Sequence, residues 1–125
     1  MERKQVLIVD DDTRNIFALK AVLDSRSIPY LSAASGTEAL QLLSADDHHV
    51  GVVLMDIMMP DMDGYETISA LRAMPRNSQL PVIAVTAKAM LGDREKCLEA
   101  GADNYISKPI DVDELLVQLQ QYLSR

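Results

Sequence analysis

Five short segments rich in apolar residues recur along the chain, and polar or charged residues follow each of them closely. They cover residues 5–9, 29–33, 50–55, 80–85 and 103–107. Short runs of Val, Ile and Leu without strict alternation are typical of parallel strands that are buried on both faces. The pattern therefore predicts five strands, of which the last is short.

Between these segments, apolar residues recur at a spacing of three and four, which is typical of helices that bury one face. Ser35 and Glu38 form a capping box, and Asp111 is placed as the N-terminal cap of the last helix. Gly101 is placed as a left-handed C-terminal cap. The predicted helices cover residues 13–25, 36–43, 64–74, 91–100 and 112–123, and residues 75–79 are predicted as a loop.

This alternation of strands and helices predicts an α/β fold, with a parallel sheet covered by helices on both faces. At 125 residues the chain is long enough for one ordinary domain, which we expect to span residues 1–125. Functional sites in open parallel sheets lie beyond the carboxyl ends of the strands. The residues that follow the strands are therefore the first candidates for function.

The composition narrows the classes of function. The formal net charge of −7 argues against a nucleic-acid-binding surface, which needs a basic face. No apolar run approaches membrane-spanning length and the start does not resemble a signal peptide, so we expect a cytoplasmic protein without membrane contact. The lone Cys97 is expected to be a buried thiol. His48 and His49 are expected to be exposed and without a role.

Charged and hydroxyl side chains stand where four of the predicted strands end. Asp10 and Asp11 follow the first, Asp56 the third, Thr86 the fourth and Lys108 the fifth. If these strands are neighbours, three carboxylates converge and repel one another unless a cation lies among them. Hard oxygen ligands without His or Cys favour Mg²⁺, with Mn²⁺ as a substitute.

Such a group of residues suits phosphoryl transfer, in which catalysis is mostly positioning and charge neutralisation. In this interpretation Asp56 is the nucleophile and becomes an aspartyl phosphate. Each residue also has a simpler explanation. Asp and Thr are common turn or cap residues, which would account for Asp56 and Thr86, and Lys108 could be a solvated surface charge. Asp12 is read first as a helix cap. The absence of a P-loop motif argues against direct use of ATP.

Four separated motifs carry a resemblance to a known family. They are Val9-Asp10-Asp11, MDIMMPDMDG around Asp56, AVTA around Thr86, and AGADNYISKP ending at Lys108-Pro109. In this order they make the chain resemble the receiver domains of two-component response regulators over nearly its whole length. The resemblance implies a flavodoxin-like, doubly wound sheet of five parallel strands in the order 2-1-3-4-5, with five helices.

The resemblance also implies a role for each matching residue. Asp56 accepts the phosphoryl group, and Thr86 and Lys108 contact its oxygens. Asp11 binds Mg²⁺ directly, Asp10 binds it mostly through water, and the backbone carbonyl of Met58 is a further ligand.

Further expectations from the resemblance concern conformation and partners. Ala87 leaves room for the phosphoryl group, Tyr105 changes rotamer as Thr86 moves, and the Lys108–Pro109 bond is cis. The partner is a histidine kinase or a His-containing phosphotransfer domain, and the fourth helix, fifth strand and fifth helix offer a surface for a homodimer. The chain would catalyse its own phosphorylation and dephosphorylation while acting primarily as a signalling switch.

Several alternatives stay open at this point. The stretch from Ala87 to Asp111 is most similar to receivers fused to hybrid sensor histidine kinases, but a stand-alone single-domain regulator fits nearly as well. An interaction module of the same fold that is never phosphorylated, or a flavodoxin-like cofactor binder, are further possibilities. The acidic Asp10–Asp12 loop argues against the cofactor binder because it repels an anion.

Overall fold

The computed structural model describes residues 4–45, 47–59, 62–86 and 93–124. The elements follow one another as β1 (Gln5–Val9), α1 (Thr13–Ser25), β2 (Tyr30–Ala33), α2 (Gly36–Leu43), β3 (Val50–Asp56), α3 (Gly64–Arg72), the 3₁₀ turn η1 (Pro75–Asn77), β4 (Val82–Thr86), α4 (Asp93–Ala100), β5 (Asn104–Ser107) and α5 (Val112–Leu123). The predicted alternation of strands and helices is thereby confirmed.

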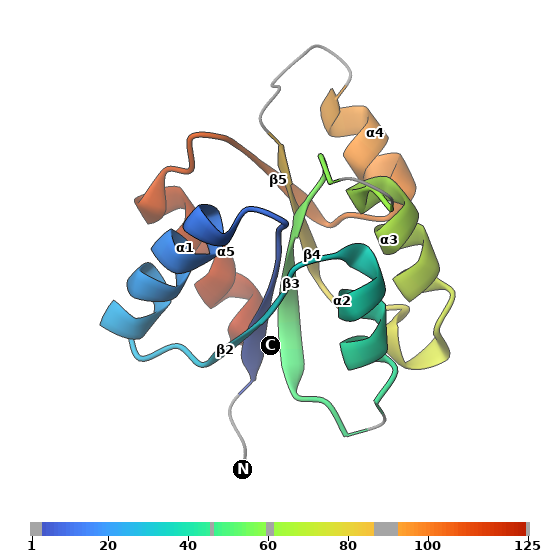
Figure 1. The fold of residues 1–125 in the computed structure, drawn as a ribbon, viewed down its shortest axis with the longest axis horizontal. Helices are drawn as coiled ribbons and strands as arrows, with labels where there is room; N and C mark the ends of the chain where they lie inside the picture. Colours follow the sequence, from blue (N-terminus) through green and yellow to red (C-terminus); the bar gives the residue numbers. More distant parts are fainter. Residues whose placement is uncertain (1–3, 46, 60–61, 87–92, 125) are drawn as a thin grey trace.

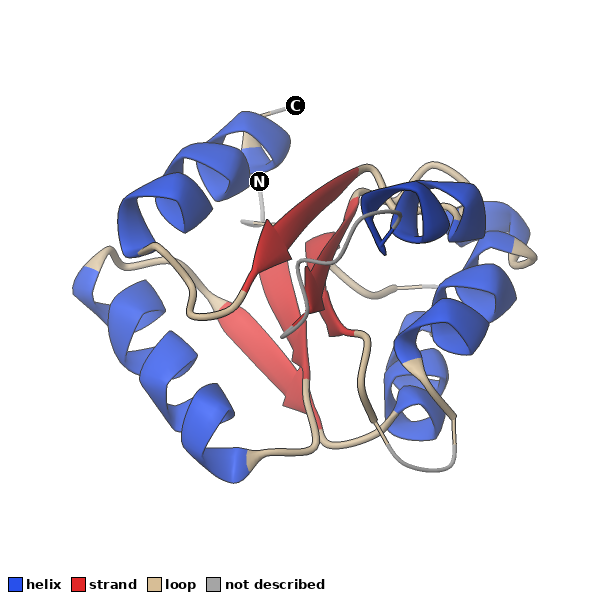
Figure 2. Cartoon of the chain, turned by 90° about the horizontal axis from the view of Figure 1, so that it is seen from above, coloured by secondary structure: helices blue, strands red, loops and turns tan. Residues whose placement is uncertain are grey.

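The five strands form one parallel sheet in the order β2-β1-β3-β4-β5 (Figure 1). Helices α1 and α5 cover one face of the sheet, and α2, α3 and α4 cover the other, as the view from above also shows (Figure 2). The doubly wound architecture and the strand order both match the sequence-based expectation. The order changes direction at β1 and β3, which places a functional site beyond the carboxyl ends of these two strands.

Two hydrophobic cores form because successive side chains of a strand point to opposite faces. From β1, Leu7 and Val9 enter the core under α2, α3 and α4, whereas Val6 and Ile8 enter the core under α1 and α5. Every residue of β3 is buried, as expected for the central strand. None of the helices in the described part of the chain combines the length and apolar character needed to cross a bilayer.

The predicted boundaries needed small corrections around β4. The strand begins at Val82 and not at Leu80, because Pro81 has no N–H to donate and the Leu80 N–H donates to the Asn77 carbonyl. Helix α3 ends at Arg72, two residues earlier than predicted, and the predicted loop after it contains η1. The predicted start of the fourth helix at Leu91 lies outside the described residues.

Side-chain caps fix where the helices begin and end. Ser35 accepts the Glu38 N–H at the start of α2, and the Glu38 carboxylate accepts the Ala34 N–H in return. Asp111 caps α5 as predicted. Gly101 has a φ of 116° after α4, where its N–H donates to the Leu98 carbonyl, so the predicted left-handed cap is also confirmed.

Ser27 occupies the equivalent left-handed position after α1, with a φ of 56°. Its N–H donates to the Asp24 carbonyl and the Ile28 N–H to the Leu23 carbonyl. An L-residue pays a steric cost in this region that glycine avoids. Ser27→Gly is therefore expected to raise the free energy of unfolding by about 0.5 kcal/mol in urea denaturation. Ser25→Gly, inside the last turn of α1, should lower it, and a loss of stability in both variants would contradict the prediction.

The expectation for His48 was wrong, whereas His49 is exposed as predicted. His48 is half-buried, and its Nδ1 accepts the Val50 N–H at 3.2 Å. Its Nε2 lies 2.9 Å from Oδ1 of the buried Asn77, whose amide donates to the Leu43 carbonyl. Because Nδ1 is an acceptor, Nε2 carries the proton and donates. The ring thus joins the start of β3 to η1, a partner 29 residues away.

Candidate functional site

The register of the sheet brings the predicted residues to one edge. Val9 pairs with Met55 across β1 and β3, and Thr86 pairs with Ser107 across β4 and β5. Asp10 and Asp11 follow β1, Asp56 is the last residue of β3, and Lys108 follows β5. The structure therefore places these side chains close to one another, as the strand-end argument predicted.

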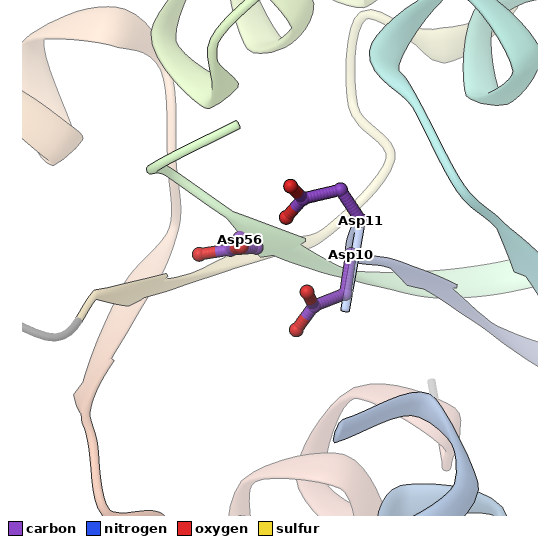
Figure 3. A group of neighbouring side chains, drawn as sticks. All are labelled: Asp10, Asp11 and Asp56. Atoms are coloured by element: carbon purple, nitrogen blue, oxygen red, sulfur yellow. The ribbon is translucent and has the colours of Figure 1, made fainter. Parts of the chain in front are cut away.

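Three carboxylates form the centre of the site. Asp10, Asp11 and Asp56 each offer an oxygen atom, and these atoms all lie within 4.8 Å of one another. Figure 3 shows Asp10 and Asp11 on the segment that follows β1, with Asp56 beside them on β3. Asp10 and Asp56 are each only 4% exposed, whereas Asp11 is exposed to solvent. Two charges are therefore buried beside each other at the bottom of the group.

The orientation of Asp10 is fixed by three neighbours. Its Oδ1 accepts a hydrogen bond from the Asp12 N–H at 2.9 Å, and its Oδ2 accepts a hydrogen bond from the Asn15 amide at 3.4 Å. Lys108 Nζ lies 3.8 Å from the same Oδ2. Asn15 was not assigned this role from the sequence, although it lies in the first turn of α1, directly after the acidic loop.

Asp12 does not join the carboxylate group. Its side chain accepts the Arg14 N–H at 2.9 Å and caps α1, as expected for this residue. This backbone hydrogen bond also lowers the pKa of the Asp12 carboxyl below its ordinary value. Asp12 therefore stays ionised at the positive end of the helix and outside the site.

Asp56 is held from two sides. Its Oδ1 accepts the Met58 N–H at 3.3 Å and lies 3.5 Å from Lys108 Nζ. Burial raises the pKa of Asp56 to about 6 and the charge of Asp10 adds to this effect, while Lys108 and the Met58 N–H oppose it. One ammonium thus faces three carboxylates, so the group would bind a further cation favourably. Hard oxygen donors of this kind fit Mg²⁺.

The backbone beside Asp56 approaches α3 very closely. The Gly64 N–H donates to the Ile57 carbonyl at 3.0 Å. A Cβ atom on Gly64 would lie 2.6 Å from the Asp56 carbonyl oxygen and 2.7 Å from Ile57 Cα, and neither backbone atom can move away alone. Only glycine fits at this first position of α3. Pro60, which the sequence suggests as a second residue that shapes this loop, lies outside the described residues.

Gly64→Ala is therefore expected to lower the free energy of unfolding by about 2–3 kcal/mol, because the added methyl group overpacks the backbone. Urea denaturation measures the change. Ser69→Ala is the control, since Ser69 is an exposed position on the same helix. Equal losses in the two variants would show that the approach to Asp56 is not what requires glycine.

Thr86 and Lys108 complete the site on neighbouring strands. The Lys108 N–H donates to the Thr86 carbonyl at 2.8 Å, and Thr86 is 4% exposed. The Lys108–Pro109 bond is cis, as expected. Tyr105 is half-buried and packs against the core under α2, α3 and α4. Ala87 lies outside the described residues.

Met58 stands out among the residues of the site because it is apolar and yet 60% exposed. Its neighbours Ile57 and Met59 are buried in the core under α2, α3 and α4. The side chain of Met58 therefore lies at the solvent side of the loop that follows Asp56. Cys97, by contrast, is buried and lies away from this edge in α4, as predicted.

Comparisons with known proteins agree with this geometry. A family model described as a response regulator receiver domain matches residues 6–120. The polar-differentiation response regulator DivK of Brucella ovis is 38% identical over 120 residues, which cover 96% of each chain.

Two solved structures are similar over almost the whole chain. A putative response regulator from Chloroflexus aurantiacus superposes with a TM-score of 0.90 at 31% identity, covering 99% of this chain and 100% of that one. The receiver domain of the sensor histidine kinase PA1611 from Pseudomonas aeruginosa superposes with a TM-score of 0.87 at 34% identity, with the same coverage. That structure holds a magnesium ion in its active-site cleft.

Proposed function

Because the chain belongs to the family of response regulator receiver domains, we propose that residues 1–125 form one receiver domain that accepts a phosphoryl group on Asp56. The observation that supports this most directly is the environment of Asp56. Its carboxylate is buried at the end of β3, 3.5 Å from Lys108 Nζ, in a group with the carboxylates of Asp10 and Asp11.

In the transfer step, an Asp56 oxygen attacks the phosphorus atom of a phosphohistidine. The new P–O bond forms as the P–N bond breaks, and the imidazole leaves with the electron pair. The Met58 N–H and the Lys108 ammonium hold the Asp56 carboxylate in place. Lys108 balances charge on the phosphoryl oxygens, and the Thr86 hydroxyl donates a hydrogen bond to one of them.

The carboxylates of Asp10, Asp11 and Asp56, together with the backbone carbonyl of Met58, are the groups that would hold Mg²⁺, with Mn²⁺ as a substitute. When bound, the ion supplies positive charge that offsets the carboxylates and the phosphoryl oxygens. The 4.8 Å limit on the spacing of the three carboxylates and the burial of two of them support this assignment.

We further propose that Thr86 and Tyr105 form the switch. Tyr105 pairs with Ala84 across β4 and β5, so their side chains point to the same face of the sheet. Thr86 lies two residues after Ala84 on the same strand and therefore shares that face with Tyr105. Movement of Thr86 toward a phosphoryl oxygen would leave space into which the half-buried Tyr105 ring turns. The surface of α4, β5 and α5 would then change shape, and it is the surface that we propose for a homodimer.

The partner that fits this chemistry is a cytoplasmic histidine kinase or a His-containing phosphotransfer domain. We propose a place in a phosphorelay, with an origin in a hybrid sensor kinase supported by the similarity to the receiver of PA1611. A stand-alone regulator is the second candidate, favoured because the match to DivK covers 96% of that protein.

The proposed function is tested by incubating the chain with acetyl phosphate, with Mg²⁺ or with EDTA. We expect intact mass spectrometry to show a gain of one phosphoryl group that depends on Mg²⁺. Reduction of the acyl phosphate with borohydride and peptide mapping should place it on Asp56. No gain of mass, or a phosphoryl group on another residue, would contradict the proposal.

Met58 is expected to control how long the phosphoryl group persists. Its exposed apolar side chain follows Asp56 by two residues, where it hinders the approach of water. Met58→Asn offers a hydrogen bond to that water worth about 1 kcal/mol, which corresponds to roughly fivefold faster hydrolysis. The rate is measured by loss of the phosphoryl mass after removal of the donor. Met58→Leu should keep the slow rate, and equal rates in all three proteins would exclude this role.

A further inference from the structure

A cavity of about 310 Å³ extends from the carboxylate group into the layer between the sheet and the helices α1 and α5. These two helices lie side by side on that face (Figures 1 and 2). Ile8 and Leu54 of the sheet line its floor, and its walls come from α1, the segment after β5 and α5. The wall residues used below are Ala18, Val22 and Ile110.

The cavity has one charged end and an otherwise apolar lining. Asp10, Asp56, Lys108 and Asn15 line the charged end. With Asp11 beside them, three carboxylates face one ammonium, so this end carries an excess of negative charge. An anion would be repelled, and a neutral apolar molecule would leave this charge without a partner.

We propose that this cavity binds a small organic monocation with a compact apolar body, such as an arylmethylamine. The ammonium group would pair with Asp10 and Asp56, and the ring would pack against Ala18, Val22 and Ile110, which line the cavity and are at least partly exposed. The volume is close to the lower limit of about 300 Å³ for small-molecule sites, and it is roughly twice that of an engineered cavity that holds benzene. This ligand site is distinct in chemistry from the proposed phosphoryl site, although it shares two carboxylates with it.

One consequence follows from the shared carboxylates. An ammonium group at Asp10 and Asp56 occupies the place that we propose for Mg²⁺, so the ligand and the metal ion compete. A molecule of this class would therefore act as an inhibitor of phosphorylation. The binding itself does not depend on phosphorylation, and it can be measured on the unphosphorylated chain without metal.

The first measurement is a titration of the whole chain with benzylamine in EDTA, followed by amide NMR. We expect a Kd of about 1 mM, with shifts in the backbone of Ala18, Val22 and Ile110. Benzyl alcohol lacks the charge and ethylamine lacks the ring. Each is expected to bind at least about tenfold more weakly, because each keeps only one half of the interaction.

Two variants on one helix provide the matched comparison. Ala18 and Ala21 are both exposed on α1, but only Ala18 lines the cavity. Ala18→Phe should fill part of the cavity and weaken benzylamine binding at least about tenfold, and Ala21→Phe should leave it unchanged. Ala18→Leu replaces the first variant if thermal unfolding shows that Ala18→Phe does not fold.

Three results would overturn the proposal. Equal binding of benzylamine to the Ala18 and Ala21 variants would place the ligand elsewhere. Equal binding of ethylamine would show simple ion pairing at the carboxylates, and equal binding of benzyl alcohol would show that charge has no role. Failure of the acetyl phosphate experiment would count against the proposed function but would leave this binding result standing.

Discussion

Asp56→Asn is expected to abolish phosphoryl incorporation from acetyl phosphate and at the same time to stabilise the metal-free chain. The first effect follows because an amide oxygen is too weak a nucleophile to form the acyl phosphate. The second follows because the variant removes a buried charge that lies close to Asp10. Phosphoryl incorporation is lost while the free energy of unfolding rises. A variant that only damaged the fold would lower both.

The gain in stability should depend on pH. Burial and the charge of Asp10 raise the pKa of Asp56 to about 6 in the folded state, so the folded wild type binds a proton more readily than the unfolded chain. The contribution of Asp56 to wild-type stability is therefore greatest at low pH and is lost as the pH rises through about 6. In EDTA at pH 7.5 we expect Asp56→Asn to be more stable by about 1–2 kcal/mol in urea denaturation. The difference should disappear near pH 4, where Asp56 is protonated in the wild type.

Asp12→Asn is the control for this experiment. Asp12 is the neighbouring acid that caps α1 outside the carboxylate group, and asparagine caps a helix equally well. This variant should retain full phosphorylation and unchanged stability. If Asp12→Asn also blocked phosphorylation, or if Asp56→Asn destabilised the metal-free chain, Asp56 would not be the phosphoryl acceptor whose buried charge destabilises the fold.

Arg72→Met is expected to lower the free energy of unfolding by about 3 kcal/mol. The guanidinium of Arg72, at the end of α3, donates to the Gly101 carbonyl at 2.8 Å and to the Asn77 carbonyl at 3.1 Å. It also donates to Asp103 Oδ2 at 2.8 Å, which in turn accepts the Val82 N–H. Its removal would leave several partly buried carbonyls and a carboxylate without their donor, and each charged hydrogen bond is worth roughly 1.5–3 kcal/mol.

Urea denaturation of two further variants separates this network from a general effect of lost charge. Arg72→Lys should recover only a small part of the stability, because an ammonium cannot reach acceptors on three sides as the planar guanidinium does. Arg26→Met changes an exposed arginine at the end of α1 and should stay within about 0.5 kcal/mol of the wild type. A loss of similar size at Arg26, or full recovery by lysine, would show that the geometry of Arg72 is not responsible.

The residues of the site could be predicted from the sequence better than the polar contacts that hold the surrounding elements together. Asp10, Asp56, Thr86 and Lys108 were found because each ends or follows a strand, and parallel strands bring such positions together. The fold followed from the same alternation of patterns. Both the strand-end residues and the alternation of strands and helices follow from patterns among neighbouring residues, which can be seen in the sequence itself.

The missed features are long-range polar contacts. His48 reaches Asn77 across 29 residues, and Arg72 reaches Asp103 across 31. No periodic pattern marks either pair, since a polar residue in a loop looks the same whether or not it has a distant partner. The start of β4 was misplaced because the apolar run continues through Leu80 and Pro81, although Pro81 has no N–H to donate to a partner.

The contacts of Arg72 lie at the amino ends of β4 and β5, whereas Asp56 ends β3 at the opposite edge of the sheet. Seven residues of β3 separate the two edges by roughly 20 Å. At this distance, a charge placed on Asp56 has little electrostatic effect on groups at the amino edge. A protein that reads this charge has to contact the loops at the carboxyl edge or the adjoining flank of β5. The amino edge, in turn, is the place where a tag, a fluorophore or a surface tether would disturb signalling least.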